Sequence, residues 1–511
     1  MPPMVVIPIR SETLRILKVQ HHNVASVICN RVNNQKEEQY LVKWSSKKPT
    51  SYPVFSWHTP LELVNCLELV QDYLEAKQTH SSRKRKSPDT DTEIDRRASP
   101  ANRLLSSSRA SSTSSTERSS SSSGRTINAE IKTYNGVLEE SKGAITAKSV
   151  TQPDIPRISV ADIPTLDMVQ TARSSSTYTA ENMIRNEILQ RLRALPGAKV
   201  HLSNVHDRSA PSLRFKFIAE SVLQEGVFKA DPATQIGCQQ CRPHMGRNIG
   251  CEYTKKCDCL EYASVDEARL SDEQKKEYRT IREEGGSTIG LPKKFPYYAD
   301  ASDRTGCLVP FYLRSRNPIY ECNDSCACGP FCRNKNVQRG RHVELEIFKT
   351  KKRGWGLRAK QDLREGEFID TYRGEIITDE EATRREESGG KAKASYLYSL
   401  DKFAESEGLS QEELYVVDGE YMGGPIKFMN HSCEPNCRQY TVSYNKHDCK
   451  VYDIALFACR NIPAMEELTF DYLDKDEEED DDDEAVESSQ PSQESVPCLC
   501  GAKKCRKWLW T

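Results

Sequence analysis

The chain has 511 residues, of which 29% are charged and 37% hydrophobic, and a formal net charge of −2. This length predicts two to four domains rather than one. No apolar run approaches the roughly 20 residues of a membrane span and no secretory signal is visible, so we expect no membrane partner and reduced cysteines. The near-neutral total hides a basic block at residues 83–86 and an acidic run at residues 474–487.

Residues 12–78 have the pattern of a small module in which short strands precede one helix. Thr59-Pro60-Leu61-Glu62 has the form of a capping box at the start of that helix. The order of elements, with Tyr40-Leu41-Val42-Lys43-Trp44 and the later Trp57, resembles a chromodomain. The expected strands are residues 14–19, 24–32 and 39–44.

Chromodomains bind methyl-lysine in an aromatic cage, because the ring faces attract a quaternary cation. Trp44 matches one cage position, Tyr52 lies near a second, and the third falls near Leu14, which is not aromatic. The resemblance therefore implies a contact with a methyl-lysine histone tail. The alternative is that Trp44 and Trp57 serve mainly as core.

Residues 79–180 are rich in Ser, Arg, Thr and Pro, a composition that cannot bury enough apolar surface to order a chain. We predict a disordered tether here. Its basic block is typical of a nuclear-import or nucleic-acid patch, or of a solvated linker. The next segment, residues 181–235, opens with a helical stripe that Pro196-Gly197 ends, and we expect it to pack near the catalytic half. The stripe consists of Ile184, Ile188, Leu192 and Leu195.

Nine cysteines gather in two groups within residues 236–340. Spacings such as Cys-x-Cys bring thiolates within reach of one metal, whereas such close neighbours pair poorly as disulfides. Three tetrahedral zinc ions need twelve ligand positions, which nine sulfurs supply if six bind singly and three bridge. All positions would then be filled by protein, so this zinc is structural. The nine are Cys238, Cys241, Cys251, Cys257, Cys259, Cys322, Cys326, Cys328 and Cys332.

A smaller group, Cys498, Cys500 and Cys505, lies in residues 494–511. Three thiolates leave one position of a tetrahedral zinc unfilled, and Cys433 in Asn430-His431-Ser432-Cys433 is the natural fourth ligand. This zinc would join the tail of the chain to the segment around His431.

Residues 341–473 carry the remaining motifs. Glycines flank a tryptophan in Gly354-Trp355-Gly356, which permits close approach of the backbone to a planar ligand, although a tight hairpin turn is the more common interpretation of this motif alone. The other segments are Ser395–Leu400, Lys427–Cys433, the buried run Ile454–Ala458, and Glu467–Tyr472.

In this order the motifs resemble the SET-domain histone lysine methyltransferases. The nine cysteines match the pre-SET element and the last three cysteines the post-SET element. With a chromodomain-like front, the chain is most similar to fungal members of the heterochromatin class, which act on histone H3 lysine 9. The resemblance implies a mostly β SET fold with a pseudoknot, flanked by zinc-binding pre-SET and post-SET elements and by a small α+β chromodomain.

The resemblance also implies residue roles. Tyr472 orients the substrate amine, Tyr396 lines the lysine channel and Phe470 limits the number of methyl groups. Trp510 matches an aromatic residue near the channel, on the substrate side. Contacts with S-adenosylmethionine fall to Gly354, Trp355, Gly356, Tyr396, Lys427, Asn430 and His431.

The implied partner is the histone H3 tail on nucleosomes, and the implied location is nuclear chromatin, in particular heterochromatin. Two alternatives stay open: a catalytically inactive scaffold that binds chromatin, and an active SET enzyme for a different lysine. The acidic segment, residues 474–493, is either a solvated loop or an electrostatic modulator of the histone-tail groove.

Overall fold

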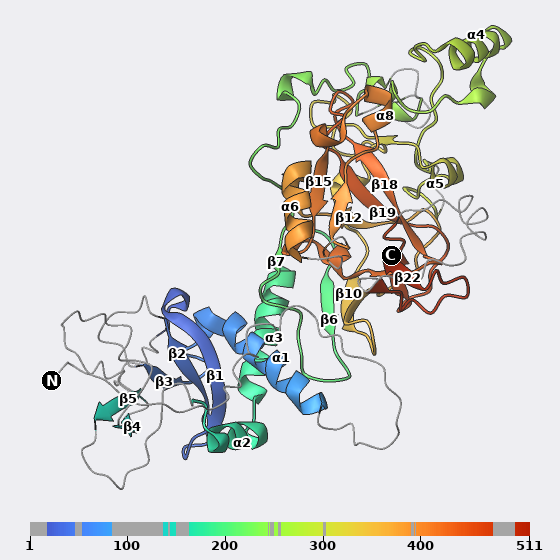
Figure 1. Ribbon diagram of the computed structural model, residues 1–511. Helices are drawn as coiled ribbons and strands as arrows, with labels where there is room; N and C mark the ends of the chain where they lie inside the picture. The colour runs from blue at the N-terminus through green and yellow to red at the C-terminus, as the bar shows by residue number, and fades with distance from the viewer. Residues whose placement is uncertain are drawn as a thin grey trace, which may run out of the picture. The chain divides into compact units, whose positions relative to one another are not determined.

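The structure is a computed structural model in which the chain forms two compact units, Met1–Ile184 and Arg185–Thr511 (Figure 1). Within the described ranges, no helix is both long and apolar enough to cross a bilayer. These ranges are residues 18–45, 54–83, 136–141, 144–149, 163–243, 245, 250–253, 257–299, 303–389, 393, 395–473 and 496–510.

The first unit contains an antiparallel sheet in the order β1-β2-β3-β5-β4. The cluster of Leu41, Phe55 and Trp57 is buried beneath it. The expected capping box at Thr59 is present, but it opens a turn and a short 3-10 segment, and the α-helix begins later, at Leu67. The elements are β1 (Val24–Val32), β2 (Glu38–Trp44), β3 (Phe55–His58), α1 (Leu67–Arg83), β4 (Gly136–Ser141), β5 (Ala144–Ser149) and α2 (Leu166–Ser174).

The prediction of a disordered tether over residues 79–180 is wrong for part of that range, because β4, β5 and α2 fall inside it. The Ser-rich average hid short apolar stretches with their own partners. Ala172 of α2 and Ile163 before it pack into the cluster beneath the sheet. Glu38 accepts hydrogen bonds from the amides of Thr179 and Ala180, so a strand residue caps the first turn of the helix α3 (Tyr178–Arg193).

The second unit is built from three sheets that meet around the site. Their strand orders are β17-β20-β11-β10-β6, β12-β19-β18-β9 and β14-β15-β13-β8. The strands of the first two sheets are β6 (Val200–Ser203), β10 (Leu345–Lys349), β11 (Trp355–Ala359), β17 (Asn430–His431), β20 (Glu467–Phe470), β9 (Ile319–Tyr320), β12 (Phe368–Tyr372), β18 (Cys437–Ser443) and β19 (Asp453–Ala458). Those of the third are β8 (Val222–Leu223), β13 (Glu375–Thr378), β14 (Leu397–Ser399) and β15 (Tyr415–Asp418).

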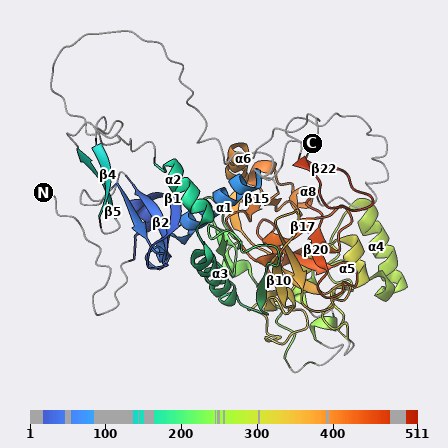
Figure 2. The ribbon, with the colours of Figure 1, turned by 90° about the horizontal axis from the view of Figure 1, so that it is seen from below.

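In the first of these sheets, β20 lies between β11 and β17, and Figure 2 shows β17, β20 and β10 together. β17 pairs in parallel with β20, with Asn430 opposite Thr469 and His431 opposite Phe470. The segment that leads to Tyr472 is therefore inserted between two earlier strands instead of being added at an edge. This insertion brings the two ends of the SET motif together.

The extension at residues 185–235 packs on the catalytic sheets, since β6 pairs with β10, β8 with β13, and β7 (Lys216–Phe217) with β16 (Met422–Gly423). A buried ion pair strengthens this attachment. Arg341 lies 2.6 Å from Asp370 of β12 and donates hydrogen bonds to the carbonyls of Pro196 and Ala198.

The central core of the unit lies on the sheet β12-β19-β18-β9. Phe368 and Phe457 are fully buried with ring centroids 5.4 Å apart, and Tyr312 of α5 (Pro310–Ser315) packs with them. Within the insert at residues 263–302, the helix α4 (Asp272–Glu284) buries none of its residues and lies at the periphery in Figures 1 and 2. The acidic segment at residues 474–493 lies outside the described residues.

Candidate active site and metal centres

The turn between β10 and β11 presents the Gly-Trp-Gly motif. Gly354 has a φ of +69° and no atom within 4 Å of where a Cβ would stand, so the backbone there adopts a conformation that suits glycine and borders open space. A Cβ on Gly356 would meet Glu467 Oε1 at 2.9 Å. Both glycines are therefore required, one for the turn and one for close packing against β20.

The Asn-His pair is held against this turn. Asn430 Nδ2 donates to the carbonyl of Trp355 at 3.2 Å and to Glu467 Oε1 at 2.8 Å. Arg353 donates to Glu467 at 2.5 Å and to the carbonyl of His431 at 3.2 Å. The Arg353–Glu467 pair thus joins the predicted cofactor segments, although the sequence analysis assigned no role to either residue.

The His431 side chain is buried and fixes the start of the Tyr472 segment. Its Nδ1 accepts the amide N–H of Tyr472 at 3.2 Å, which places the ring proton on Nε2, 3.2 Å from Cys433 Sγ. Burial lowers the pKa of His431 to about 4, against the opposing effect of Asp471. The imidazole is neutral near pH 7 and links a backbone amide on one side to a cysteine on the other.

Tyr472 and Phe470 lie next to this histidine. The Tyr472 hydroxyl donates to the carbonyl of Met429 at 2.8 Å, and its ring lies 4.9 Å from Phe470 and 5.4 Å from His431. Burial raises the pKa of Tyr472, with a further contribution from the nearby Tyr396. The phenol therefore stays protonated at physiological pH, and its oxygen keeps a lone pair that can accept a hydrogen bond.

Tyr396 is fixed by its backbone. Its N–H donates to the carbonyl of Lys393, and its own carbonyl accepts from the Gly419 amide at 3.0 Å and from the Tyr372 hydroxyl at 2.8 Å. Three hydrogen bonds thus set the position of a residue that begins the strand segment at β14. Burial raises the pKa of Tyr396.

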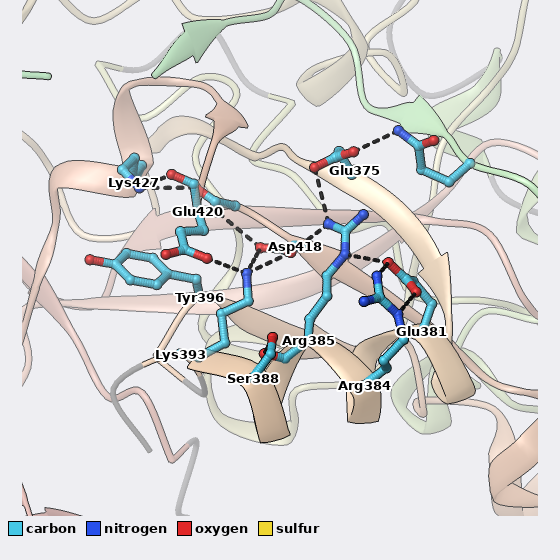
Figure 3. Close-up of polar contacts among 12 residues, drawn as sticks. Glu375, Glu381, Arg384, Arg385, Ser388, Lys393, Tyr396, Asp418, Glu420 and Lys427 are labelled. Atoms are coloured by element: carbon cyan, nitrogen blue, oxygen red, sulfur yellow. Dashed lines mark hydrogen bonds and ion pairs between the residues drawn. The ribbon is translucent and has the colours of Figure 1, made fainter. Parts of the chain in front are cut away.

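Lys427 packs on the face of Tyr396, as Figure 3 shows. Its Nζ lies 4.2 Å from the centroid of the Tyr396 ring and 4.7 Å from that of Phe215, and it donates to the carbonyls of Gly419 and Glu420. Burial lowers the pKa of Lys427 to about 8, while Glu420 and Asp418 act in the opposite direction. The ammonium is therefore charged at pH 7 and titrates just above it.

All nine predicted cysteines of residues 236–340 are buried in one cluster. Three sets of four have sulfur atoms within 4.8 Å of one another; Cys322 belongs to all three sets, and Cys238, Cys251 and Cys328 each belong to two. Sulfur–sulfur distances of 3.6 to 4.0 Å within these sets agree with the roughly 3.8 Å edge of a tetrahedron with zinc–sulfur bonds of about 2.3 Å. The sets are Cys238, Cys251, Cys257, Cys322; Cys238, Cys322, Cys326, Cys328; and Cys251, Cys322, Cys328, Cys332.

Cys241 and Cys259 lie outside these three sets, although both are buried in the same cluster. Cys259 Sγ is 3.4 Å from Cys326 Sγ, and Cys241 adjoins Cys238. Every cysteine of the chain lies in the described part, and all 19 are thiols rather than disulfides. The donor set and its sharing fit a zinc cluster of several ions with a structural role.

The fourth set joins Cys433 to Cys498, Cys500 and Cys505, as the sequence predicts. Cys433 Sγ and Cys498 Sγ are 3.9 Å apart, and Cys500 Sγ and Cys505 Sγ are 3.5 Å apart. Unlike the other cluster, these cysteines are partly exposed. The donor atoms fit one tetrahedral zinc.

A further contact ties the tail to the site, because Arg506 lies 2.6 Å from Asp471 and donates its amide to Cys433 Sγ. Trp510 belongs by its backbone to β22 (Trp508–Trp510), which pairs with β21 (Val496–Pro497). The Trp510 side chain lies outside what the structure describes. Residues 46–53, which include Tyr52, also lie outside the described residues.

Comparisons with known proteins identify similar sequences over the second unit. The sequence family described as SET domain matches residues 354–473, and that described as Pre-SET motif matches residues 193–335. The histone-lysine N-methyltransferase of Fusarium mangiferae, H3 lysine-9 specific, is 39% identical over 302 residues, which are 58% of this chain and 83% of that protein.

The corresponding protein of Neurospora crassa is 38% identical over 318 residues, which are 61% of this chain and 88% of the relative. Among solved structures, that of the Neurospora SET domain protein DIM-5, a histone lysine methyltransferase, has a TM-score of 0.45 at 36% identity. It covers 55% of this chain and 96% of the solved one.

Proposed function

The chain belongs to the SET-domain histone-lysine N-methyltransferases, and from this premise we propose that it methylates lysine 9 of histone H3. Such an enzyme acts on chromatin in the nucleus. The observation that carries the proposal is that Gly354–Gly356, Asn430-His431 and Tyr472, far apart in sequence, are joined by hydrogen bonds around one site, with Tyr396 near Tyr472. We further propose that its products are di- and trimethyl-lysine, marks of heterochromatin and gene silencing.

The fit of S-adenosylmethionine rests on the open space at Gly354, the Trp355 ring beside it and the ammonium of Lys427. When bound, this cofactor supplies a methyl group carried on a positively charged sulfur. We assign its adenosine and methionine contacts to Gly354, Trp355, Gly356, Tyr396, Asn430 and His431. We assign the carboxylate to Lys427, the cation of the set, whose ammonium also donates to the carbonyls of Gly419 and Glu420.

The substrate lysine must be neutral to accept a methyl group, yet with a pKa of roughly 10.4 fewer than about one lysine in a thousand is neutral at pH 7. Burial between Tyr472, Tyr396 and Phe470 disfavours the ammonium form. The Tyr472 oxygen, whose proton is committed to the Met429 carbonyl, accepts a hydrogen bond from the amine and directs its lone pair. Positioning then supplies much of the rate enhancement.

The strand beside Tyr396 offers a seat for the histone tail. Among the strands that the structure describes, β14 has a neighbour on one side only, β15, and it follows directly after Tyr396. An unpaired edge offers backbone donors and acceptors to an extended peptide. We infer that the histone tail pairs with β14, which would deliver its lysine to the tyrosines.

The proposed reaction is tested by incubating the full chain with S-adenosylmethionine and an H3 tail peptide. We expect mass spectrometry to place methyl groups on lysine 9, and none to appear when lysine 9 is arginine. Methylation of another residue instead would favour the SET enzyme of different specificity. No transfer to peptides or nucleosomes, with the zinc sites filled, would favour the inactive scaffold.

Phe470 provides a test of product specificity. The ring centroids of Phe470 and Tyr472 lie 4.9 Å apart. We expect Phe470→Tyr to shift the main product from trimethyl- to monomethyl-lysine, because the new hydroxyl adds a hydrogen-bonding group beside the amine. It would hold the amine or a water where a further methyl must fit. Unchanged trimethylation by mass spectrometry would contradict this role. The control is the wild type, with the products of the two proteins compared at equal numbers of turnovers. Phe457→Tyr would not serve, because it buries a hydroxyl in the core.

Lys427 should make cofactor binding pH-dependent. Because its pKa is about 8, the cation is present at pH 7 and lost as the pH rises through 8 to 9. We expect the Kd for S-adenosylmethionine, measured by calorimetry, to rise about tenfold over that range, the scale of a charge-assisted hydrogen bond. Lys427→Arg keeps its charge and should show a flat profile. Identical profiles for the two proteins would remove Lys427 from the carboxylate contact.

The N-terminal module is a candidate second contact with histone tails. Trp44 is buried with its Nε1 donating to Ser56 Oγ at 2.7 Å, and the Arg31 guanidinium covers the Trp57 ring at 4.0 Å. This packing favours the core interpretation of both rings. We therefore expect calorimetry to find no preference for a trimethyl-lysine H3 peptide over the unmodified peptide. A clear preference for the trimethyl-lysine peptide that Trp44→Ala abolishes would support the aromatic-cage interpretation instead.

A further inference from the structure

A cluster of charges lies next to Tyr396 (Figure 3). It is formed by the buried residues Lys393, Asp418 and Glu375 and the partly exposed Glu420 and Arg385. We call it the Lys393 cluster. The Lys393 ammonium lies 2.9 and 2.7 Å from the two oxygens of Asp418 and also pairs with Glu420. Arg385 lies 2.7 Å from Asp418 and 3.1 Å from Glu375. Two cations thus share one carboxylate at the end of β15.

The two charges at the centre of the cluster, Lys393 and Asp418, are buried, and each has oppositely charged partners. The Asp418 side chain is fully buried and that of Lys393 is 4% exposed. Asp418 also accepts the Glu420 amide at 3.0 Å. Burial raises the pKa of Asp418, but the bonds from Lys393 and Arg385 outweigh it and lower the pKa below its usual value. Burying ions is costly, and apolar residues in their place often give equal or greater stability. Such a cluster therefore suggests a role in fixing one geometry.

The geometry that it fixes is that of the turn formed by Asp418, Gly419 and Glu420. Lys393 binds the carboxylates at both ends of this turn, whereas Lys427 binds the carbonyls of Gly419 and Glu420. The turn has little freedom to move elsewhere, because a Cβ on Gly419 would stand 2.5 Å from the Tyr372 hydroxyl oxygen. Two lysines from separate segments therefore hold one turn. Lys393 binds side chains of the turn, and Lys427 binds its backbone carbonyls.

This turn in turn holds Tyr396. The Gly419 amide donates to the Tyr396 carbonyl, and the Tyr396 amide donates to the carbonyl of Lys393 itself. Lys393 is thus connected to Tyr396 by two routes, directly along the chain and through Asp418 and Gly419. The Lys393 ammonium is thus linked both to the tyrosine and to the turn that Lys427 binds.

We propose that Lys393 is a positioning residue of the cofactor site, which fixes Tyr396 and Lys427 through the Asp418–Glu420 turn without touching cofactor or substrate. The proposal rests on the proposed methyl-transfer function. It differs from a role in stability alone, because it requires the cofactor affinity, and not only the folded fraction, to depend on the Lys393 charge.

The test compares Lys393→Met with Lys293→Met in the full chain. Lys293 is a matched control: it is also buried, with its ammonium on Thr288 Oγ1 at 2.7 Å, but it lies in the insert. We expect Lys393→Met to raise the calorimetric Kd for S-adenosylmethionine about tenfold and to lower kcat/KM by about 10- to 100-fold, the scale of a small misplacement at a reacting centre. Lys293→Met should change the melting temperature only.

A pH profile separates positioning from stability. Burial is the main cause of the lowered pKa of Lys427; of the charged groups around its ammonium, Glu420 and Asp418 raise this pKa and Lys393 lowers it further. Removing the Lys393 cation should therefore move the alkaline rise in Kd to higher pH. Lys393→Arg, which keeps the charge, should leave the rise near pH 8 and restore most of the affinity.

Glu420→Gln guards against a Lys393→Met protein that does not fold. The Glu420 side chain is 27% exposed, so this variant should fold, and we expect a Kd about threefold above wild type, in keeping with one partly exposed ion pair. Lower melting temperatures with unchanged Kd, kcat and pH profile would overturn the proposal. A wild type that binds no S-adenosylmethionine would instead contradict the proposed function.

Discussion

Replacing Tyr472 with phenylalanine is expected to lower kcat by about 100-fold or more, with the Kd for S-adenosylmethionine kept within about threefold. The scale is that of losing one oriented polar group at a reacting centre. The Tyr472 phenol is a polar group in the aromatic wall of Tyr472, Phe470 and Tyr396, and it is the one to which we assign the lysine amine. Without the Tyr472 oxygen, the neutral amine keeps its apolar surroundings but loses the hydrogen bond that orients its lone pair.

Tyr440→Phe is the matched control for this substitution. Tyr440 is also buried and also donates its hydroxyl to a backbone carbonyl, that of Leu313 at 3.0 Å, but it belongs to the central core. Both variants lose one buried hydrogen bond, so their melting temperatures should fall by similar amounts. Single-turnover methyl transfer should then separate them. Equal rates for the two variants would show that Tyr472 acts only as a packing residue.

The site can be predicted from sequence where chemistry demands particular residue types. Zinc needs four ligands, and the short spacings of Cys498, Cys500 and Cys505 leave one position open, for which Cys433 is the predicted donor; the four sulfurs do meet in the fold. The Gly-Trp-Gly turn is equally accessible, since Gly354 has a positive φ and Gly356 leaves no room for a side chain.

Charge partnerships are harder to predict, because a charged residue carries no mark of its partner. Lys393, Asp418 and Glu420 look like ordinary surface charges in the sequence, yet the first two are buried together. One signal is present: Asp418 ends the apolar run Tyr415-Val416-Val417, and an acid that closes a buried strand needs a cation. The partner itself comes from another segment, which only the fold identifies.

The same reason explains the error over residues 79–180. Composition averages over a long window, whereas order there depends on single contacts such as those of Glu38 with the amides of Thr179 and Ala180. A strand residue more than a hundred positions away supplies the cap. Neither periodicity nor composition of the segment contains that information.

The zinc of the tail gives the second large expected effect. We expect Cys505→Ser to lose one zinc per chain and to lower kcat/KM by about 100-fold or more, while the zinc of the buried cluster stays. The tail consists of two very short strands, and its described polar contacts with the site are few, chiefly Arg506 with Asp471 and the Lys503 amide with Glu434. A structural zinc contributes an apparent 10–16 kcal/mol, roughly, which those contacts cannot replace.

The loss should reach catalysis through a short path. Cys433 follows His431 by two residues, and His431 accepts the amide N–H of Tyr472. Release of the tail also removes Arg506 from Asp471, the residue before this tyrosine. Zinc per chain by mass spectrometry, melting temperature and kcat/KM should therefore be measured together. Cys449→Ser, a partly exposed cysteine outside all four sulfur sets, is the control and should match the wild type in each.

A mild chelator extends the test without any substitution. The sulfurs of the tail set are partly exposed and those of the larger cluster are buried, so the tail zinc should leave first, and activity should fall with that first ion. Activity that survives its loss would show that the tail is dispensable for the reaction. Activity that falls only when the remaining zinc leaves would assign the effect to unfolding of the buried cluster, and the link from Cys433 to Tyr472 would then carry no catalytic weight.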